Sequence, residues 1–161
     1  GHNNWPESAM QAGFEFLVAQ RYPSTACAPG PAVLCLQGGR FRAEISWTTP
    51  DGASGSGQVP AATTGFASGL FWFFDPANWE MLVKVLDGCA LNDHYWLFAA
   101  ATTNVAFTMT VTDTQSGATR SYQNPQGQAA PPIQDTQAFS CSSPSAASVH
   151  QSGLAGSAAV R

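Results

Sequence analysis

Charged side chains are scarce in this sequence. Only 10 % of its 161 residues are Asp, Glu, Lys or Arg, whereas soluble proteins usually carry roughly 25 %. Six are Lys or Arg, and the formal net charge is −4. Nucleic acids and anionic membranes are bound through clustered cations, so we expect neither as a partner. Neutral polar residues solvate the surface instead, which is typical of secreted bacterial modules.

Long apolar runs and catalytic motifs are also missing. No run approaches the ~18 residues of a membrane helix, so we expect no membrane-spanning segment. The G-x-S-x-G spacing of serine hydrolases does not occur. His94 lies in a predicted turn, where solvation explains it. Glu44 and Glu80 lie on predicted strands, where a solvated outer face explains both. The sequence therefore predicts that the protein is not an enzyme.

Four cysteines are present, at Cys27, Cys35, Cys89 and Cys141. An even number without C-x-x-C spacing indicates two disulfides rather than a zinc or redox site. Three pairings are compatible with the sequence. One of them closes a local loop between Cys27 and Cys35 and leaves Cys89 to hold Cys141 near the core. Each bridge stabilises the fold by roughly 2–4 kcal/mol.

From Phe41 to Tyr122 the pattern is that of β-strands. Phe41, Ala43, Ile45 and Trp47 alternate with polar residues, as on a strand with one buried face. Turns rich in Gly, Pro, Asp and Asn separate about six such segments, and no helical pattern lies between them. The sequence predicts an all-β protein, an antiparallel β-sandwich of about six to eight strands, with its domain at residues 27–141.

The two flanks have a different composition. Residues 1–26 form either a helix or an added strand through Phe14 and Phe16. Such a strand pairs with an open sheet edge, and we favour an edge of the same chain over that of a neighbour. Residues 142–161 are a Ser/Ala-rich tail.

The tryptophans are the main candidates for binding. Trp72 and Trp96 lie in segments that are apolar on both faces, and Trp79 follows a turn, where we expect the most exposed ring. Exposed rings stack on sugars or anchor protein interfaces. These three residues, with Phe14 and Phe16, are therefore the predicted ligand or interface residues. The alternative, which the burial tendencies of these residues favour, is that the rings only fill the core and the disulfide region.

Metal binding has weak candidates only. Asp75, Asp87 and Asp93 lie at predicted turns or strand ends, where carboxylate oxygens suit calcium. Asp is also an ordinary turn residue, because it hydrogen-bonds its own backbone. Calcium is thus an open prediction, and we expect no other cofactor.

Four motifs carry a resemblance: CLQGGRFRAEISW, FWFFDPAN, VKVLDGC and VTDTQSG. With these motifs the chain resembles a recurrent β-domain family of secreted bacterial proteins, over roughly Cys27 to Cys141. Its shared patterns are CLxxxRFxxxxxW, FWFFxPxN, VKVLDGC and VTDTxxG. The resemblance implies an extracellular, disulfide-bonded β-domain that often stands beside other modules. It implies no activity, so no functional residue is transferred from it.

These observations predict a non-catalytic secreted module for binding or structural assembly at the bacterial cell surface or in the matrix. Its partner is a polysaccharide, a protein surface or copies of itself. One alternative is a filament subunit that engages the next copy through its N-terminal strand. Another is a secreted protease inhibitor that presents the disulfide-braced loop at residues 26–35.

Overall fold

The computed structural model describes residues 26–61 and 65–142. Within these ranges the chain forms nine strands and one helical turn. They are β1 (Leu34–Leu36), β2 (Phe41–Thr48), β3 (Ser54–Ser56), β4 (Ser68–Trp72), β5 (Trp79–Gly88), α2 (Cys89–Asn92), β6 (His94–Ala101), β7 (Ala106–Asp113), β8 (Thr119–Asn124) and β9 (Ile133–Ser140). The predicted N-terminal helix or strand, with Phe14 and Phe16, lies outside the described residues, as does the tail from residue 143.

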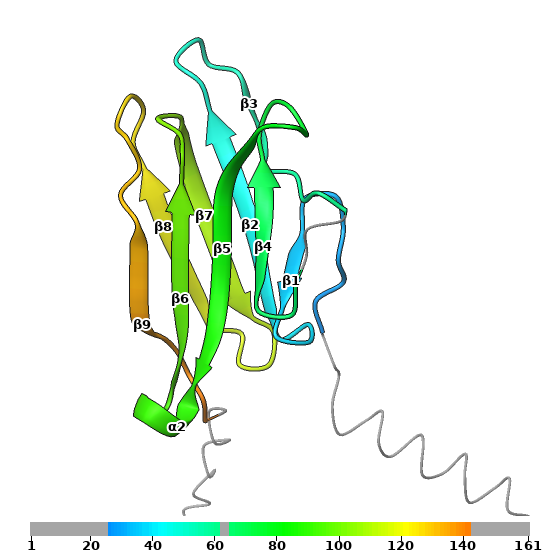
Figure 1. Ribbon diagram of the computed structural model, residues 1–161, viewed down its shortest axis with the longest axis vertical. Coiled ribbons are helices and arrows are strands. Elements are labelled where there is room, and N and C mark those ends of the chain that lie inside the picture. Colours follow the sequence, from blue (N-terminus) through cyan, green and yellow to red (C-terminus); the bar gives the residue numbers. More distant parts are fainter. Residues whose placement is uncertain (1–25, 62–64, 143–161) are drawn as a thin grey trace, which may run out of the picture.

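The strands form two antiparallel sheets packed face to face (Figure 1). The first has the order β1-β2-β7-β8, and β3 pairs with the far end of the β2 edge that β1 occupies. The second has the order β4-β5-β6-β9. The predicted all-β sandwich is confirmed. More strands are present than expected, because β1 and β3 are very short and because β9 follows a Pro-rich stretch that gives no strand signal. An edge strand such as β9 can begin directly after prolines.

Alternation along the strands builds the core. On β2, Phe41, Ala43 and Ile45 are buried, as predicted. Phe107, Met109 and Val111 on β7 and Met81, Val83 and Val85 on β5 show the same period of two, and their side chains meet between the sheets. Trp47 is only half-buried and packs against this core.

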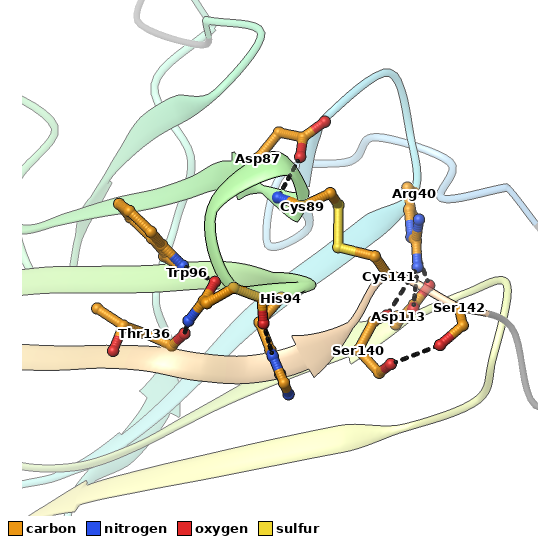
Figure 2. The surroundings of a disulfide bond; sticks show 11 residues. Arg40, Asp87, Cys89, His94, Trp96, Asp113, Thr136, Ser140, Cys141 and Ser142 are labelled. Carbon is orange, nitrogen blue, oxygen red and sulfur yellow. Dashed lines mark hydrogen bonds and ion pairs between the residues drawn. A yellow bond between two sulfur atoms is a disulfide. The ribbon is translucent and has the colours of Figure 1, made fainter.

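Two disulfides fasten the sandwich at different places. Cys27, in the loop that leads into β1, pairs with Cys35 on β1, and Cys89 pairs with Cys141. The second bridge joins α2 to the end of β9 at one end of the sandwich (Figure 2). Such bridges are characteristic of an oxidising compartment. In the described ranges no helix has the length and apolarity to cross a bilayer.

Candidate binding face

The β4-β5-β6-β9 sheet carries large apolar side chains on both of its surfaces. Phe71, Val83 and Leu97 point inward and belong to the core. The residues between them point outward, because successive side chains of a strand alternate. Their apolar members neither belong to the core nor pack against it. We call this outer surface the apolar face. Its large residues are Leu70, Trp72, Trp79, Leu82, Lys84, Leu86, Trp96 and Phe98, and the small residues Ser68 and Ala100 lie among them.

Strand pairing arranges the apolar face in rows. Trp72 lies opposite Trp79, and three rows further along the strands Leu86 lies opposite Trp96. At roughly 3.3 Å per residue, these rows are about 20 Å apart. Phe98 lies in the row next to Trp96. Aromatic rings therefore occupy both ends of the face, and the line that joins them runs along the strands.

Exposure differs among the three tryptophans. Trp79 is 49 % exposed, whereas Trp72 and Trp96 are half-buried. Leu82, between the two ends, is 39 % exposed. The expectation that Trp79 is the most exposed of the three rings therefore agrees with the structure. None of the three rings belongs to the core, although Trp96 packs on Gly88, beside the second disulfide.

Local hydrogen bonds fix the orientation of two indoles. The indole N–H of Trp79 donates to the carbonyl oxygen of Pro76 at 3.2 Å. The indole N–H of Trp96 donates to Oδ1 of Asn92 at 2.7 Å (Figure 2). The Trp96 ring also lies directly on Gly88, where a Cβ would overlap the indole. These rings are therefore held in place, and what they offer a partner is their apolar surface.

A turn and a buried carboxylate position Trp79. Asp75 accepts a bond from the Ala77 N–H at 2.8 Å, which closes the turn between β4 and β5. After the turn the pairing register shifts, so that Glu80 points inward and is only 4 % exposed. Its carboxylate accepts bonds from the Phe73 N–H at 2.6 Å and from the Asn78 side chain at 2.7 Å. The expectation of a solvated Glu80 is wrong, because the register shift reverses its direction.

Burial also shifts the pKa of Glu80. Desolvation raises the pKa of its carboxyl above the ordinary value of 4.5, although both hydrogen bonds act in the opposite direction. Glu44, by contrast, lies on the surface and forms an ion pair with Arg42, as the sequence suggested.

Lys84 is the one charged residue of the apolar face. It lies on β5 with Leu82 and Leu86 on either side along the strand, Phe98 opposite it on β6 and Ser68 opposite it on β4. Among the described residues, the ion pairs are those of Arg40 with Asp113 and of Arg42 with Glu44, so Lys84 takes part in neither. An ammonium group thus lies near the centre of an apolar surface without a carboxylate partner there.

At the end of the sandwich near the second disulfide, a buried ion pair joins the turn before β2 to the end of β7 (Figure 2). Arg40 donates from Nε and Nη2 to the two carboxylate oxygens of Asp113, at 3.2 and 2.9 Å. The same guanidinium lies 4.4 Å from the ring centroid of Tyr95. Asp113 is fully buried and also accepts bonds from Gln115 N–H and the Ser116 hydroxyl. Burial raises its pKa, but the bonds from Arg40, Gln115 and Ser116 outweigh burial and hold the pKa below 3.8.

The motifs behind the family resemblance have structural roles here. Arg40 and Asp113, from the first and last motifs, form the buried ion pair. Gly88 in VKVLDGC makes room for Trp96, and the cysteine after it forms a disulfide. Gly117 ends the last motif at a φ of 75°, a conformation that glycine adopts without strain. These positions build the sandwich. The motif residues that lie on the apolar face are Trp72 in FWFFDPAN and Lys84 and Leu86 in VKVLDGC.

The three calcium candidates are not brought together. Asp75 caps its turn, Asp87 accepts a bond from the Cys89 N–H at 2.9 Å, and Asp93 ends α2 with a φ of 59°. In the described part of the chain, one group of three potential ligands comes close together, Asp87 with Cys89 and Cys141. The two sulfur atoms are bonded to each other, so they provide no thiolate for a metal.

We next consider His94 and the residues that line two cavities as candidates for acid–base chemistry. His94 is paired across the strands with Ser140, yet its Nδ1 bonds the Asn92 carbonyl oxygen at 2.7 Å and no hydrogen bond joins it to the serine. One cavity of about 570 Å³ is lined by Pro29, Pro31, Val33 and Val59 among others. Neither this cavity nor one of about 500 Å³ beside β7 and β8 is lined by an acid, a base or a free thiol.

Comparison with known proteins gives no further assignment. No family model matches this chain, and no curated protein or solved structure is significantly similar to it. The resemblance to a secreted bacterial β-domain family therefore stays a prediction.

Three residues of the apolar face, Trp72, Trp79 and Trp96, were predicted from the sequence as binding candidates, and its other large residues were not. The missed residues are Leu70, Leu82, Lys84, Leu86 and Phe98. A signal for them exists in the sequence, since segments such as WEMLVKVL are apolar in both phases of the strand period. One phase fills the core, so the other must face outward.

Proposed function

We propose that this chain is a non-catalytic, secreted bacterial module that binds a partner at the cell surface or in the extracellular matrix through its apolar face. The observation that supports this most is the gathering of Trp72, Trp79 and Trp96 on one outer sheet surface. Large exposed apolar patches mark interaction sites in soluble proteins. The two disulfides are consistent with an extracellular location.

The two alternative functions gain no support from the described residues. In the loop at residues 26–35, Gly30 and Val33 bond each other through both backbone groups, and Pro31 accepts a bond from the Val59 N–H. These backbone groups are thus already used within the domain rather than free to pair with a protease. The filament hypothesis depends on Phe14 and Phe16, which lie outside the described residues. Both alternatives stay predictions.

Retention on extracellular material of the encoding bacterium tests the proposed function. The intact oxidised protein is compared with Trp79→Ala and with the triple variant Trp72→Ala/Trp79→Ala/Trp96→Ala, after urea unfolding has shown which variants are folded. The control is Thr108→Ala/Thr110→Ala/Thr112→Ala on the outer surface of the first sheet. We expect the control to be retained like the wild type and the tryptophan variants to be washed off. Equal retention of all folded variants would refute the apolar face as the contact surface.

A further inference from the structure

We propose that the apolar face binds a polysaccharide chain that runs along strand β5, with sugar rings stacked on Trp96 at one end and on Trp72 and Trp79 at the other. This inference rests on the proposed function and names the class of partner. The two ends of the face are about 20 Å apart, a span that several consecutive sugar rings cover and a single small sugar does not.

The chemistry of the rings favours stacking as the mode of recognition. Both the Trp79 and the Trp96 indole N–H groups are already bonded within the domain. Gly88 further fixes the Trp96 ring, because any side chain there would displace it. Rings that are fixed before binding lose little conformational entropy when a partner arrives. What remains available is the apolar ring surface, against which the C–H faces of pyranose rings pack.

Lys84 argues against a protein as the occupant. The central part of a protein interface is depleted of charged residues, and of lysine in particular. The apolar face has Lys84 between Leu82 and Leu86, with no carboxylate on the face to neutralise it. A protein that covered this surface would have to desolvate the ammonium group or supply a carboxylate for it.

A second copy of the chain fits this position even less well. In a symmetric pair the same surfaces face each other, so the Lys84 ammonium groups of the two copies would approach each other in an apolar surrounding. The face itself has no carboxylate that its partner's Lys84 could use. Like charges brought together in this way disfavour the pair.

A polysaccharide accommodates the lysine without such a cost. Its ring and hydroxyl oxygens accept hydrogen bonds, and the ammonium group carries three donors. The long aliphatic stem of a lysine can lie on apolar neighbours while its head stays hydrated or bonded to a sugar oxygen. One charged donor between stacking rings thus suits a ligand that alternates apolar faces with oxygen atoms.

Binding to purified polysaccharides tests the inference. The probes are insoluble cellulose and chitin in sedimentation assays, and soluble β-1,3-glucan, amylose and alginate in affinity electrophoresis. We expect at least one probe to bind, and Trp79→Ala or Trp96→Ala to weaken that binding by about two- to tenfold, as the loss of one stacked ring does. Trp79→Phe, which retains a ring, should recover most of the affinity. Absence of binding to every probe, or equal binding by the alanine variants, contradicts the inference.

Lys84→Met separates a saccharide from a protein occupant. The variant keeps an apolar stem and removes the charge. For a saccharide we expect weaker binding to the same probe, by about threefold or more, because a hydrogen bond to a charged donor is lost. Stronger retention, or dimers of the variant in light scattering, would instead indicate a protein occupant and overturn the inference.

Protease treatment of the extracellular material distinguishes failure of this inference from failure of the proposed function. If retention on the material survives exhaustive proteinase K digestion and still requires Trp79, a polysaccharide partner is supported. If digestion abolishes a retention that requires Trp79, the partner is a protein: the inference fails while the binding function holds. If retention never depends on the apolar face, the proposed function itself is refuted.

Discussion

The two outer surfaces of the sandwich differ sharply, although both belong to antiparallel sheets of the same domain. The outer surface of the first sheet, here the threonine face, carries on β2, β7 and β8 the polar residues Arg42, Glu44, Ser46, Thr48, Thr108, Thr110, Thr112, Thr119, Ser121 and Gln123, with Ala106 as the apolar residue among them. The apolar face carries tryptophan, leucine and phenylalanine at the equivalent outward positions. Neutral polar residues therefore solvate the outer surface of the first sheet, whereas the second sheet has few of them on its outer surface. The apolar face is a local feature rather than a result of overall composition.

The Arg40–Asp113 ion pair supports the sandwich beneath both faces, because Arg40 and Asp113 come from the first sheet and its turn and Tyr95 comes from the second. Breaking this pair should therefore have the largest effect on stability. Arg40→Met leaves the buried Asp113 carboxylate without its cation, and we expect a loss of about 3–5 kcal/mol in the free energy of unfolding. Urea unfolding measures it. The free energy of unfolding of Asp113→Ala is measured for comparison. In that variant the charge left without its partner is the Arg40 guanidinium, which still contacts the Tyr95 ring.

The pH dependence of this loss has a defined sign. Because the folded-state pKa of Asp113 is lowered, its stabilising contribution is present above the ordinary Asp pKa and disappears as pH falls through the folded value. The cost of Arg40→Met should therefore be full at neutral pH and shrink below about pH 4. A cost that does not depend on pH would contradict this role for the pair.

Glu80 should behave in the opposite way and with a smaller effect. Glu80→Ala leaves the Phe73 N–H unsatisfied and should cost about 1–3 kcal/mol, while Glu80→Gln keeps an acceptor and should cost less. Because the folded-state pKa is raised, stability is greatest below the ordinary Glu pKa and falls as pH rises through the folded value. Glu80→Gln should remove this slope. Urea unfolding from pH 4 to 7 tests it, and an unchanged slope would exclude Glu80 as its source.

Replacing the large apolar side chains of the apolar face by threonine tests the difference between the two faces directly. Leu82→Thr, Leu86→Thr and Phe98→Thr give the second sheet an outer surface like the first. These side chains do not pack against the core, so we expect each change to alter stability by about 1 kcal/mol or less while retention on extracellular material is lost. The matched control, Thr110→Leu, adds an apolar group to the threonine face and should not create retention. Retention by the threonine variants would contradict the proposal.

The smallest effect is expected on the threonine face. Arg42 and Glu44 form a surface ion pair at 2.7 Å, with side chains 46 % and 43 % exposed. Such pairs contribute about 0.2–1 kcal/mol and weaken with salt. A double-mutant cycle with Arg42→Ala and Glu44→Ala should give a coupling free energy in this range, and a larger value would mean that this face is not merely solvated.

The sequence allowed the fold class to be predicted because particular segments are unambiguous. Phe41, Ala43 and Ile45 alternate with polar residues, so their strand has only one apolar face. Residues 81–86 are apolar in both phases, so the period alone does not tell whether Val83 or Leu82 faces the core. Glu80 was misplaced because a register shift is set by pairing with β4, which no local pattern encodes. The disulfide pairing likewise depends on strand order rather than on spacing.

The positions of the two disulfides have a mechanical consequence. Cys27 and Cys141 lie next to the first and last described residues, and each is bridged to a cysteine deeper in the chain. A pulling force that enters the domain at these points passes through sulfur rather than through β9. The covalent load path then runs only from Cys35 to Cys89, and β6, β7, β8 and β9 lie in a closed loop that tension cannot stretch. Trp96 and Phe98 belong to that unloaded loop, whereas Trp72 and Trp79 lie on the loaded segment.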